Sequence, residues 1–497
     1  MNIKSTNMKK ILDKYTTIHA LGMSTSLMLW DMRVNMPKNA IEDRGKMRSI
    51  MTGLYQDMML NKEFLDLINL AEKEELTLFE KAIIRSLKRE TKFYLAIPSE
   101  VLKEYIKLST VAYNEWAKAR AKSNFSIFKP HLEKIAEFSR KGAELLGYEN
   151  EPYDAMLDRY EEGILARDYD EMFNDIKKKI VPIFKKLAMD RSHPLEKEPY
   201  NEERLKDFIT YIVKKFGYDF NRGRLDKTTH PFTSSIGIND VRITTRYEGG
   251  KDFKPALLGS IHEFGHAIYA MQIDPSLNWT PLASGSITYS LGIHESQSRF
   301  WENMVGRSQE FIETFYDVFV ALVPNVANYD TREIYRYFNI VRPNFIRVEA
   351  DELCYPIHIL LRYELERDMM NEKISISEVP QVWNEKMENY IGIVPPDDAR
   401  GCLQDPHWTR MLGYFPTYAM GTILAAQIKN KIENEIGPLE EFIRAKNFTP
   451  VTNWQKENIH KYGSLYMPKD LIKSALGETM NVDYFVNHVD KYVKLWS

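Results

Sequence analysis

The sequence predicts a mainly α protein with a small β-sheet beside a central helix. Over most of the chain, apolar side chains recur every three or four residues with charged residues between them, which is the period of an amphipathic helix. Glycine and proline are few, at 23 and 22 residues, as expected where short connections join helices. One region, residues 228–247, is instead rich in Thr, Ile, Val and Tyr, which favour strands.

The helical period is clearest in segments spread along the whole chain. They are residues 79–95, 98–122, 128–147, 170–189, 202–216, 308–322, 355–373 and 438–446. No repeat with the period of a solenoid is present, and no shift in composition marks a boundary. We therefore expect one large domain over residues 1–497, in which two subdomains could flank a cleft.

The strand-forming region reads TTHPFTSSIGINDVRITTRY from Thr228 to Tyr247. It predicts a hairpin of two short strands around the turn residues Gly-Ile-Asn-Asp, followed by a helix that opens near Pro255. We expect the second strand, Asp240–Tyr247, to offer a sheet edge beside that helix. An extended peptide could pair with such an edge through its backbone, whatever its side chains.

Composition excludes several classes of protein. Lys plus Arg is 67 and Asp plus Glu is 70, so the net charge is 67 − 70 = −3, which argues against nucleic acid as a partner. Two cysteines in 497 residues exclude a disulfide scaffold. The N-terminus has no apolar core of a signal peptide, and no apolar run approaches the roughly 18 residues of a membrane span. We expect a cytoplasmic protein without a membrane partner.

Residues 262–266 read HEFGH and predict a metal site. His262 and His266 are four residues apart, so on a helix their imidazoles lie on one face and can bind one small cation. Glu263 follows the first histidine, where this motif places the general base that acts on a metal-bound water. The HExxH pattern also occurs by chance in unrelated helices.

A catalytic zinc needs about three protein ligands and one open position. The metzincin pattern fails, because Tyr269 and Gln272 stand where its glycine and third histidine would be. Glu295, in HESQ and 29 residues after His266, can close the site from a second helix that crosses the first. His294 points about 100° away from Glu295 on that helix and is expected to hold a carboxylate near the metal or to lie near Glu263.

HEFGH followed by HESQ resembles the zinc metallocarboxypeptidases of the carboxypeptidase Taq, or thermostable carboxypeptidase, family. Further motifs of that family are HPF at His230–Phe232, IRVEAD at Ile346–Asp351, GCLQDPHW at Gly401–Trp408, GYFPTYAMG at Gly413–Gly421 and the C-terminal LGETMNVDYF. The similarity covers essentially the whole chain. One departure is Val34, which stands where the family usually has threonine.

The resemblance implies a large helical HEXXH metallopeptidase fold with a deep active-site cleft. It implies a carboxypeptidase that releases single amino acids from peptides with a free C-terminus, with broad specificity, and a homodimer. One divalent metal per chain is expected, zinc in the first place and cobalt in the second. The alternatives are a zinc oligopeptidase or dipeptidyl carboxypeptidase of related fold, and a peptide-binding protein without activity, against which the intact Glu263 argues.

Recognition of a free C-terminus requires a cation, and arginine can bind a carboxylate through two parallel hydrogen bonds. Arg347 in IRVEAD is the candidate that the resemblance assigns to the substrate end, with Arg342 as its competitor. The structural alternative for Arg347 is an ion pair with a nearby acid in the segment 349–352. His230 in HPF could donate to a substrate carbonyl or to the terminal carboxylate.

The oxyanion of a tetrahedral intermediate needs hydrogen-bond donors. Similar metallopeptidases use a histidine and a tyrosine, and here His407 in QDPHW and Tyr418 in GYFPTY are the candidates. Asp405 could orient a neighbour, and the sequence does not separate Tyr418 from Tyr414. The remaining histidines show no metal spacing and are expected to be structural; they are His19, His131, His193, His358, His460 and His488.

Overall fold

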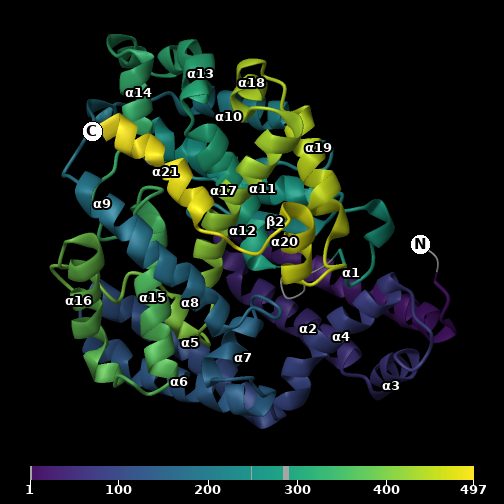
Figure 1. The fold of residues 1–497 in the computed structure, drawn as a ribbon. Helices are drawn as coiled ribbons and strands as arrows, with labels where there is room; N and C mark the ends of the chain where they lie inside the picture. The colour runs from purple at the N-terminus through teal and green to yellow at the C-terminus, as the bar shows by residue number, and fades with distance from the viewer. Residues whose placement is uncertain (1–2, 248, 284–289, 497) are drawn as a thin grey trace. The chain divides into compact units, whose positions relative to one another are not determined.

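A computed structural model describes residues 3–247, 249–283 and 290–496. It confirms the mainly α fold with a small sheet (Figure 1). The chain divides into two compact units, and each is built from three stretches of sequence. Unit 1 comprises Met1–Thr91, His193–Phe338 and Ile428–Glu478, and unit 2 comprises Lys92–Ser192, Asn339–Gln427 and Thr479–Ser497. The expectation of one domain over residues 1–497 stays a prediction.

Unit 1 holds the sheet and the HEFGH segment. Its helices are α1 (Thr6–Val34), α2 (Ile41–Met59), α3 (Lys62–Ala71), most of α4 (Leu78–Ala96), α10 (Glu202–Phe216), α11 (Phe253–Met271), α12 (Leu291–Arg299), α13 (Gln309–Leu322), α14 (Thr331–Phe338), α18 (Leu439–Arg444), α19 (Thr449–Asn458) and α20 (Pro468–Leu476). A π-helical segment, Phe300–Gly306, directly continues α12.

Unit 2 is helical. Its helices are α5 (Ser99–Ala121), α6 (Phe125–Leu146), α7 (Pro152–Asp158), α8 (Ala166–Asp175), α9 (Val181–Leu187), α15 (Tyr355–Met370), α16 (Val379–Ile391), α21 (Asp483–Trp496) and the first half of α17 (Pro416–Ile436). Short 3-10 turns carry the IRVEAD and QDPHW motifs, at Arg347–Glu349 and His407–Thr409.

The predicted helix over 170–189 is interrupted. The structure has α8, then a π-helical segment at Ile176–Ile180, and then α9. Pro182 is the cause, because its ring displaces the carbonyl one turn earlier and it has no N–H to donate. A periodicity count does not detect this, since the apolar side chains stay on one side through the widened turn.

The hairpin is present and belongs to a larger sheet. Strand β2 (Thr233–Gly237) pairs antiparallel with β3 (Asp240–Thr245), and β1 (Leu225–Lys227) pairs with β3 in parallel. The strand order is β1-β3-β2, so β3 is the central strand. The expectation that the strand at Asp240–Tyr247 offers a free edge is therefore wrong: β1 occupies that edge, and three residues were too few for a periodicity argument to detect it.

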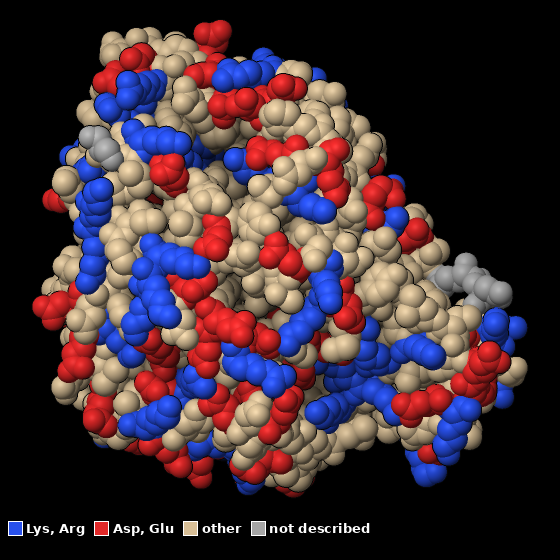
Figure 2. Space-filling view, in the orientation of Figure 1, with Lys and Arg blue, Asp and Glu red and all other residues tan. Residues whose placement is uncertain are grey.

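The surface carries both signs of charge, in agreement with the near-equal numbers of acidic and basic residues. Figure 2 shows lysine and arginine interspersed with aspartate and glutamate over the displayed face. Within the part of the chain that the structure describes, no helix is long and apolar enough to span a bilayer.

Candidate metal centre

Helix α11 carries HEFGH and is buried on nearly every side. Its apolar side chains pack under the sheet, and Ser260 Oγ donates to Thr245 Oγ1 of β3 at 2.8 Å. A helix that is apolar all round is typical of the middle of a large core. The histidines are thus held by a backbone with little freedom to move.

Helix α12 is placed against α11 by a glycine. A Cβ at Gly265 would lie 2.4 Å from the carbonyl oxygen of Gln297 and 2.5 Å from Cα of Ser298, both backbone atoms of α12. Only glycine permits this approach, since no backbone atom can move aside locally. The second helix begins with Ser290, whose hydroxyl accepts from the N–H of Ile293 at 2.8 Å. The glycine inside HEFGH was a signal for this close contact that our reading of the motif did not use.

The structure brings the three predicted ligands together. Oε2 of Glu295 lies 3.2 Å from Nε2 of His266 and 3.6 Å from Nε2 of His262. His262, His266 and Glu295 each direct one donor atom into a single group, and all three atoms lie within 4.8 Å of one another. We refer to these residues as the donor triad.

The donor triad fits a tetrahedral divalent cation. Ligands about 2.0–2.2 Å from zinc lie roughly 3.3–3.6 Å from one another in a tetrahedron. The distances of 3.2 and 3.6 Å from Glu295 to the two histidines are close to this separation. Two imidazoles and one carboxylate are also the donor set of a catalytic zinc site with one open position. The geometry and the chemistry of the set therefore both suit the ion that the sequence predicts.

Charged neighbours stabilise the ionised form of Glu295. Nε of Arg299 donates to Oε1 of Glu295 at 2.8 Å, which leaves Oε2 to face the histidines. Burial alone would raise the pKa of Glu295, but Arg299 and the two histidines hold it well below its usual range. Burial alone would lower the pKa of His262, but Glu295 and Glu302 raise it. The field at His262 thus favours a positive charge.

His294 has a partner that the sequence did not predict. Its Nδ1 lies 2.6 Å from Nδ1 of His266, so it contacts the imidazole of a predicted ligand. The close approach of the two helices at Gly265 brings the two rings together, with their centroids 4.7 Å apart. The expectation that His294 holds a carboxylate or lies near Glu263 stays a prediction. Burial and the neighbouring His266 and His460 keep the pKa of His294 well below its usual value.

Glu263 is buried and oriented by the sheet. Oγ1 of Thr233, the first residue of β2, donates to Oε2 of Glu263 at 2.6 Å and lies 2.9 Å from its backbone carbonyl. The predicted base is therefore aimed by a strand that the HPF motif precedes. His230 is exposed in the bend three residues before Thr233, and Phe232 is tied to β3 through Thr244 at 2.8 Å.

In unit 2, Arg347 is buried beside an acid that is distant in sequence. Its Nη2 donates to Oδ1 of Asp405 at 2.9 Å, and its Nη1 donates to the hydroxyl of Tyr355 at 2.8 Å. The alternative of a partner within 349–352 is wrong. Glu352 binds His488 at 2.8 Å in a separate cluster. The IRVEAD turn thus directs its arginine away from its own acids.

A second arginine shares that carboxylate, and our reading of the sequence did not identify it. Nη2 and Nε of Arg362, on α15, donate to Oδ2 of Asp405 at 2.7 and 2.9 Å. The two arginines hold the pKa of Asp405 far below its usual range against the effect of burial. We call Arg347, Arg362 and Asp405 the arginine cluster. It contains two cations and one anion, so it has one positive charge in excess.

The predicted oxyanion donors lie beside this cluster in unit 2. Nε2 of His407 is 3.4 Å from the hydroxyl of Tyr418, and Nδ1 of His407 is 3.8 Å from Oδ1 of Asp405. The guanidinium of Arg347 lies 5.0 Å from the ring of Tyr418. Burial, together with the nearby arginines, lowers the pKa of His407 to about 3, so its imidazole is neutral at pH 7.

The other candidates in unit 2 lie in different surroundings. The ring of Tyr414 stacks edge-on against Tyr160 at 5.1 Å and lies 5.4 Å from the ring of His407. Nη1 of Arg342, the competitor of Arg347, donates to the backbone carbonyl of Arg191 at 3.0 Å. The structure therefore groups Tyr418, more than Tyr414, with the arginine cluster.

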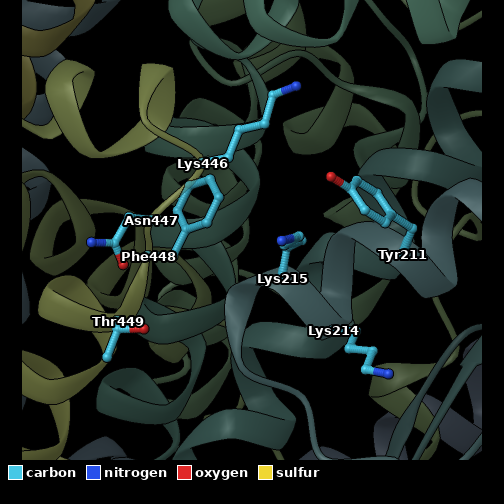
Figure 3. Close-up of a pocket in the computed structure, with 7 residues that line it drawn as sticks. All are labelled: Tyr211, Lys214, Lys215, Lys446, Asn447, Phe448 and Thr449. Atoms are coloured by element: carbon cyan, nitrogen blue, oxygen red, sulfur yellow. The ribbon is translucent and has the colours of Figure 1, made fainter.

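A cavity of about 380 Å³ lies elsewhere in unit 1 (Figure 3). One wall comes from α10 and the other from the connection between α18 and α19. The lining residues are Tyr211, Lys214, Lys215, Lys446, Asn447, Phe448 and Thr449. Exposed lysines line it instead of carboxylates or imidazoles, so it is not a second cation site, and it includes none of the predicted site residues.

Known proteins match this chain over nearly its full length. A model of the carboxypeptidase Taq (M32) metallopeptidase family matches residues 9–493. Thermostable carboxypeptidase 1 of Pyrococcus furiosus is 45% identical over 493 residues, which is 98% of each chain. Carboxypeptidase 1 of Bacillus subtilis is 37% identical over 497 residues, again 98% of each chain.

Solved structures agree with these relatives. A Pyrococcus furiosus carboxypeptidase, described as an apo-Mg form, superposes with a TM-score of 0.95 at 45% identity and covers 98% of this chain and 99% of its own. An M32 carboxypeptidase from Deinococcus radiodurans gives 0.95 at 30% identity and covers 99% and 100%. Together with the motifs and the donor triad, these matches show that the chain belongs to the carboxypeptidase Taq (M32) metallopeptidase family and is a metallocarboxypeptidase.

Proposed function

We propose that this chain hydrolyses the C-terminal peptide bond of peptides and releases single amino acids with broad side-chain tolerance. The observation that supports this most directly is the convergence of Nε2 of His262, Nε2 of His266 and Oε2 of Glu295 on adjacent helices. We infer that the donor triad holds one divalent ion, zinc in the first place and cobalt in the second. When bound, such an ion supplies Lewis-acid chemistry, since it acidifies water and polarises a carbonyl.

Glu263 acts as the general base. Its Oε2 accepts from Thr233 at 2.6 Å, so Oε1 is the oxygen presented to the attacking water. The water oxygen bonds to the carbonyl carbon as its proton passes to Glu263, and the C–N bond breaks as Glu263 returns that proton to the leaving amine. Burial of Glu263 beside a fixed hydroxyl keeps this carboxylate in one orientation.

The excess charge of the arginine cluster suits the terminal carboxylate of a peptide. Asp405 neutralises one of its two buried arginines, and a substrate carboxylate would balance the other. We assign Arg347 as the group that binds it, because its guanidinium lies 5.0 Å from the ring of Tyr418, one of the proposed oxyanion donors. His230 is a second candidate for this contact, since it is exposed and free of a strand or helix.

His407 and Tyr418 supply hydrogen bonds to the oxyanion. A neutral imidazole has one N–H to donate, and the pKa of about 3 keeps His407 neutral over the working range of a peptidase. The hydroxyl of Tyr418, within 3.4 Å of Nε2 of His407, can donate to the same oxygen. A homodimer is a further expectation, which light scattering on the purified protein would check.

The test is to incubate the purified protein with an N-terminally blocked peptide and to identify the products by mass. We expect single residues to leave stepwise from the C-terminus, activity to stop with a chelator, and zinc to restore it. Release of dipeptides or internal fragments would instead identify a dipeptidyl carboxypeptidase or an oligopeptidase. Tight binding without any cleavage, in a protein shown to contain metal, would favour a peptide-binding protein.

A further inference from the structure

The two histidines of the donor triad differ in what their Nδ1 atoms face. Nδ1 of His262 lies 2.9 Å from Oε2 of Glu302, whereas Nδ1 of His266 lies 2.6 Å from Nδ1 of His294. A neutral imidazole carries one proton, on either nitrogen. The partner at Nδ1 therefore decides whether Nε2 keeps the lone pair that a metal needs.

Glu302 is held as an anion by two arginines. Nη1 of Arg299 lies 3.2 Å from its Oε2, and Nη2 of Arg307 lies 3.2 Å from its Oε1. Arg307 is itself fixed, since its Nη1 donates to the carbonyl of Phe338 at 2.8 Å. An ionised carboxylate can only accept a hydrogen bond. The contact at 2.9 Å therefore requires the proton of His262 to be on Nδ1.

The chain places Glu302 on the same side as the third member of the triad. Glu302 lies in the π-helical segment Phe300–Gly306, seven residues after Glu295. Both carboxylates point toward α11, because Oε2 of Glu295 lies 3.6 Å from Nε2 of His262 and Oε2 of Glu302 lies 2.9 Å from Nδ1 of the same imidazole. Arg299 lies between them and bonds to both, at 2.8 and 3.2 Å. The pattern E-x3-R-x2-E thus forms one connected group.

We propose that Glu302 is a positioning residue: it binds the Nδ1 proton of His262 and so directs the lone pair of Nε2 into the donor triad. The proposal rests on the metal site of the proposed function. At His266 the corresponding place is taken by His294, so Glu302 orients one ligand and not both. Its loss weakens metal binding without removing the three ligands.

The experiment measures zinc affinity by competition with a chromophoric chelator, independently of turnover. Glu302→Leu should bind zinc roughly 10–100-fold more weakly than the wild type, the usual effect of removing such a partner. Glu302→Gln should recover part of that loss, because its amide oxygen can still accept from Nδ1. The control is Asn303→Ala, which removes the neighbouring 3.1 Å contact to Arg307 but does not touch His262; its affinity should match the wild type.

A charge-balanced variant covers the case in which Glu302→Leu does not fold. Glu302→Leu/Arg307→Leu removes one anion and one cation, and it should show the same 10–100-fold loss. Wild-type zinc affinity in either folded variant, or a lower unfolding midpoint of the metal-free protein with affinity unchanged, would overturn the proposal. Failure of the metal site itself is distinguishable, because then the wild type would bind no zinc and His266→Ala would change nothing.

Discussion

The donor triad in unit 1 and the arginine cluster in unit 2 are both buried and polar. The surroundings of the triad have too little positive charge, whereas the arginine cluster has too little negative charge. Around the triad, the three buried carboxylates of Glu263, Glu295 and Glu302 face two guanidinium groups, those of Arg299 and Arg307, and the imidazoles offer lone pairs to a cation. In the arginine cluster, one carboxylate serves two guanidinium groups. The first site therefore calls for a cation, and the second for an anion.

In the proposed function, this difference separates catalysis from recognition. A buried charge without a partner costs several kcal/mol, so a folded protein leaves one only where a ligand supplies the balance. In the proposed function, a metal ion meets that need in unit 1 and a substrate carboxylate meets it in unit 2. We therefore expect changes at the donor triad and Glu263 to affect the rate of hydrolysis, and changes in the arginine cluster to affect stability and the choice of substrate.

The largest effect is expected at Glu263. Glu263→Gln should retain zinc and fold but lower kcat by roughly 10²–10⁴, because the attacking water loses its proton acceptor. The measurement is steady-state kinetics together with metal analysis and circular dichroism on the same sample. Glu203→Gln, an exposed change on α10, is the matched control. Near-normal turnover of Glu263→Gln would show that Glu263 is not the general base.

The next effect is on stability, at the shared carboxylate. Asp405→Asn leaves two buried guanidinium groups without an anion, so we expect the free energy of unfolding to fall by about 3–5 kcal/mol. Urea titration measures it, with Asp397→Asn as control, since Asp397 pairs with Arg400 at the surface and such pairs contribute about 0–1 kcal/mol. Equal effects of the two changes would show that Asp405 balances no buried charge.

Glu366 should make the free energy of unfolding depend on pH, by about 3 kcal/mol. Its carboxylate accepts hydrogen bonds from Trp408 and Tyr153 at 3.0 and 2.7 Å. Burial raises the pKa of Glu366 from 4.5 to about 7. The native state then holds more protons than the unfolded state between pH 4.5 and 7, so the free energy of unfolding should fall as pH rises through that window. The free energy of unfolding of Glu366→Gln, measured across the same pH range, should lack this fall. If it falls with pH as steeply as that of the wild type, Glu366 is not the cause.

The smallest effect concerns selectivity. Arg347→Ala should lower kcat/KM for a free-acid peptide by about 2–3 kcal/mol, the scale of a lost charge-assisted bond. The C-terminally amidated analogue, already a poor substrate, should change much less. Arg342→Ala is the comparison, since it leaves the arginine cluster intact. The measurement is the ratio of kcat/KM for the free-acid peptide to kcat/KM for the amidated one. If this ratio is unchanged in Arg347→Ala but falls in Arg342→Ala, Arg342 and not Arg347 binds the terminal carboxylate.

The sequence alone predicted the features that depend on residues close together in the chain. The spacing of His262 and His266 on one helix placed two donors on one face, because 3.6 residues per turn leave no other arrangement. Amphipathic periodicity located helices spread along the chain, since the burial of one face imposes that period; they are α4, α5, α6, α10, α13, α15 and α18. The hairpin followed from its turn and its β-branched residues.

Only the tertiary structure decided which distant groups meet. Asp405 pairs with Arg347 across 58 residues, and no local pattern distinguishes it from the nearer acids. The partner of His294 and the contact of Glu302 with His262 depend on how closely α12 approaches α11, which Gly265 sets through the absence of a side chain. Periodicity reports which face of an element is buried. It does not report what that face meets, because packing selects among many compatible partners by shape and charge.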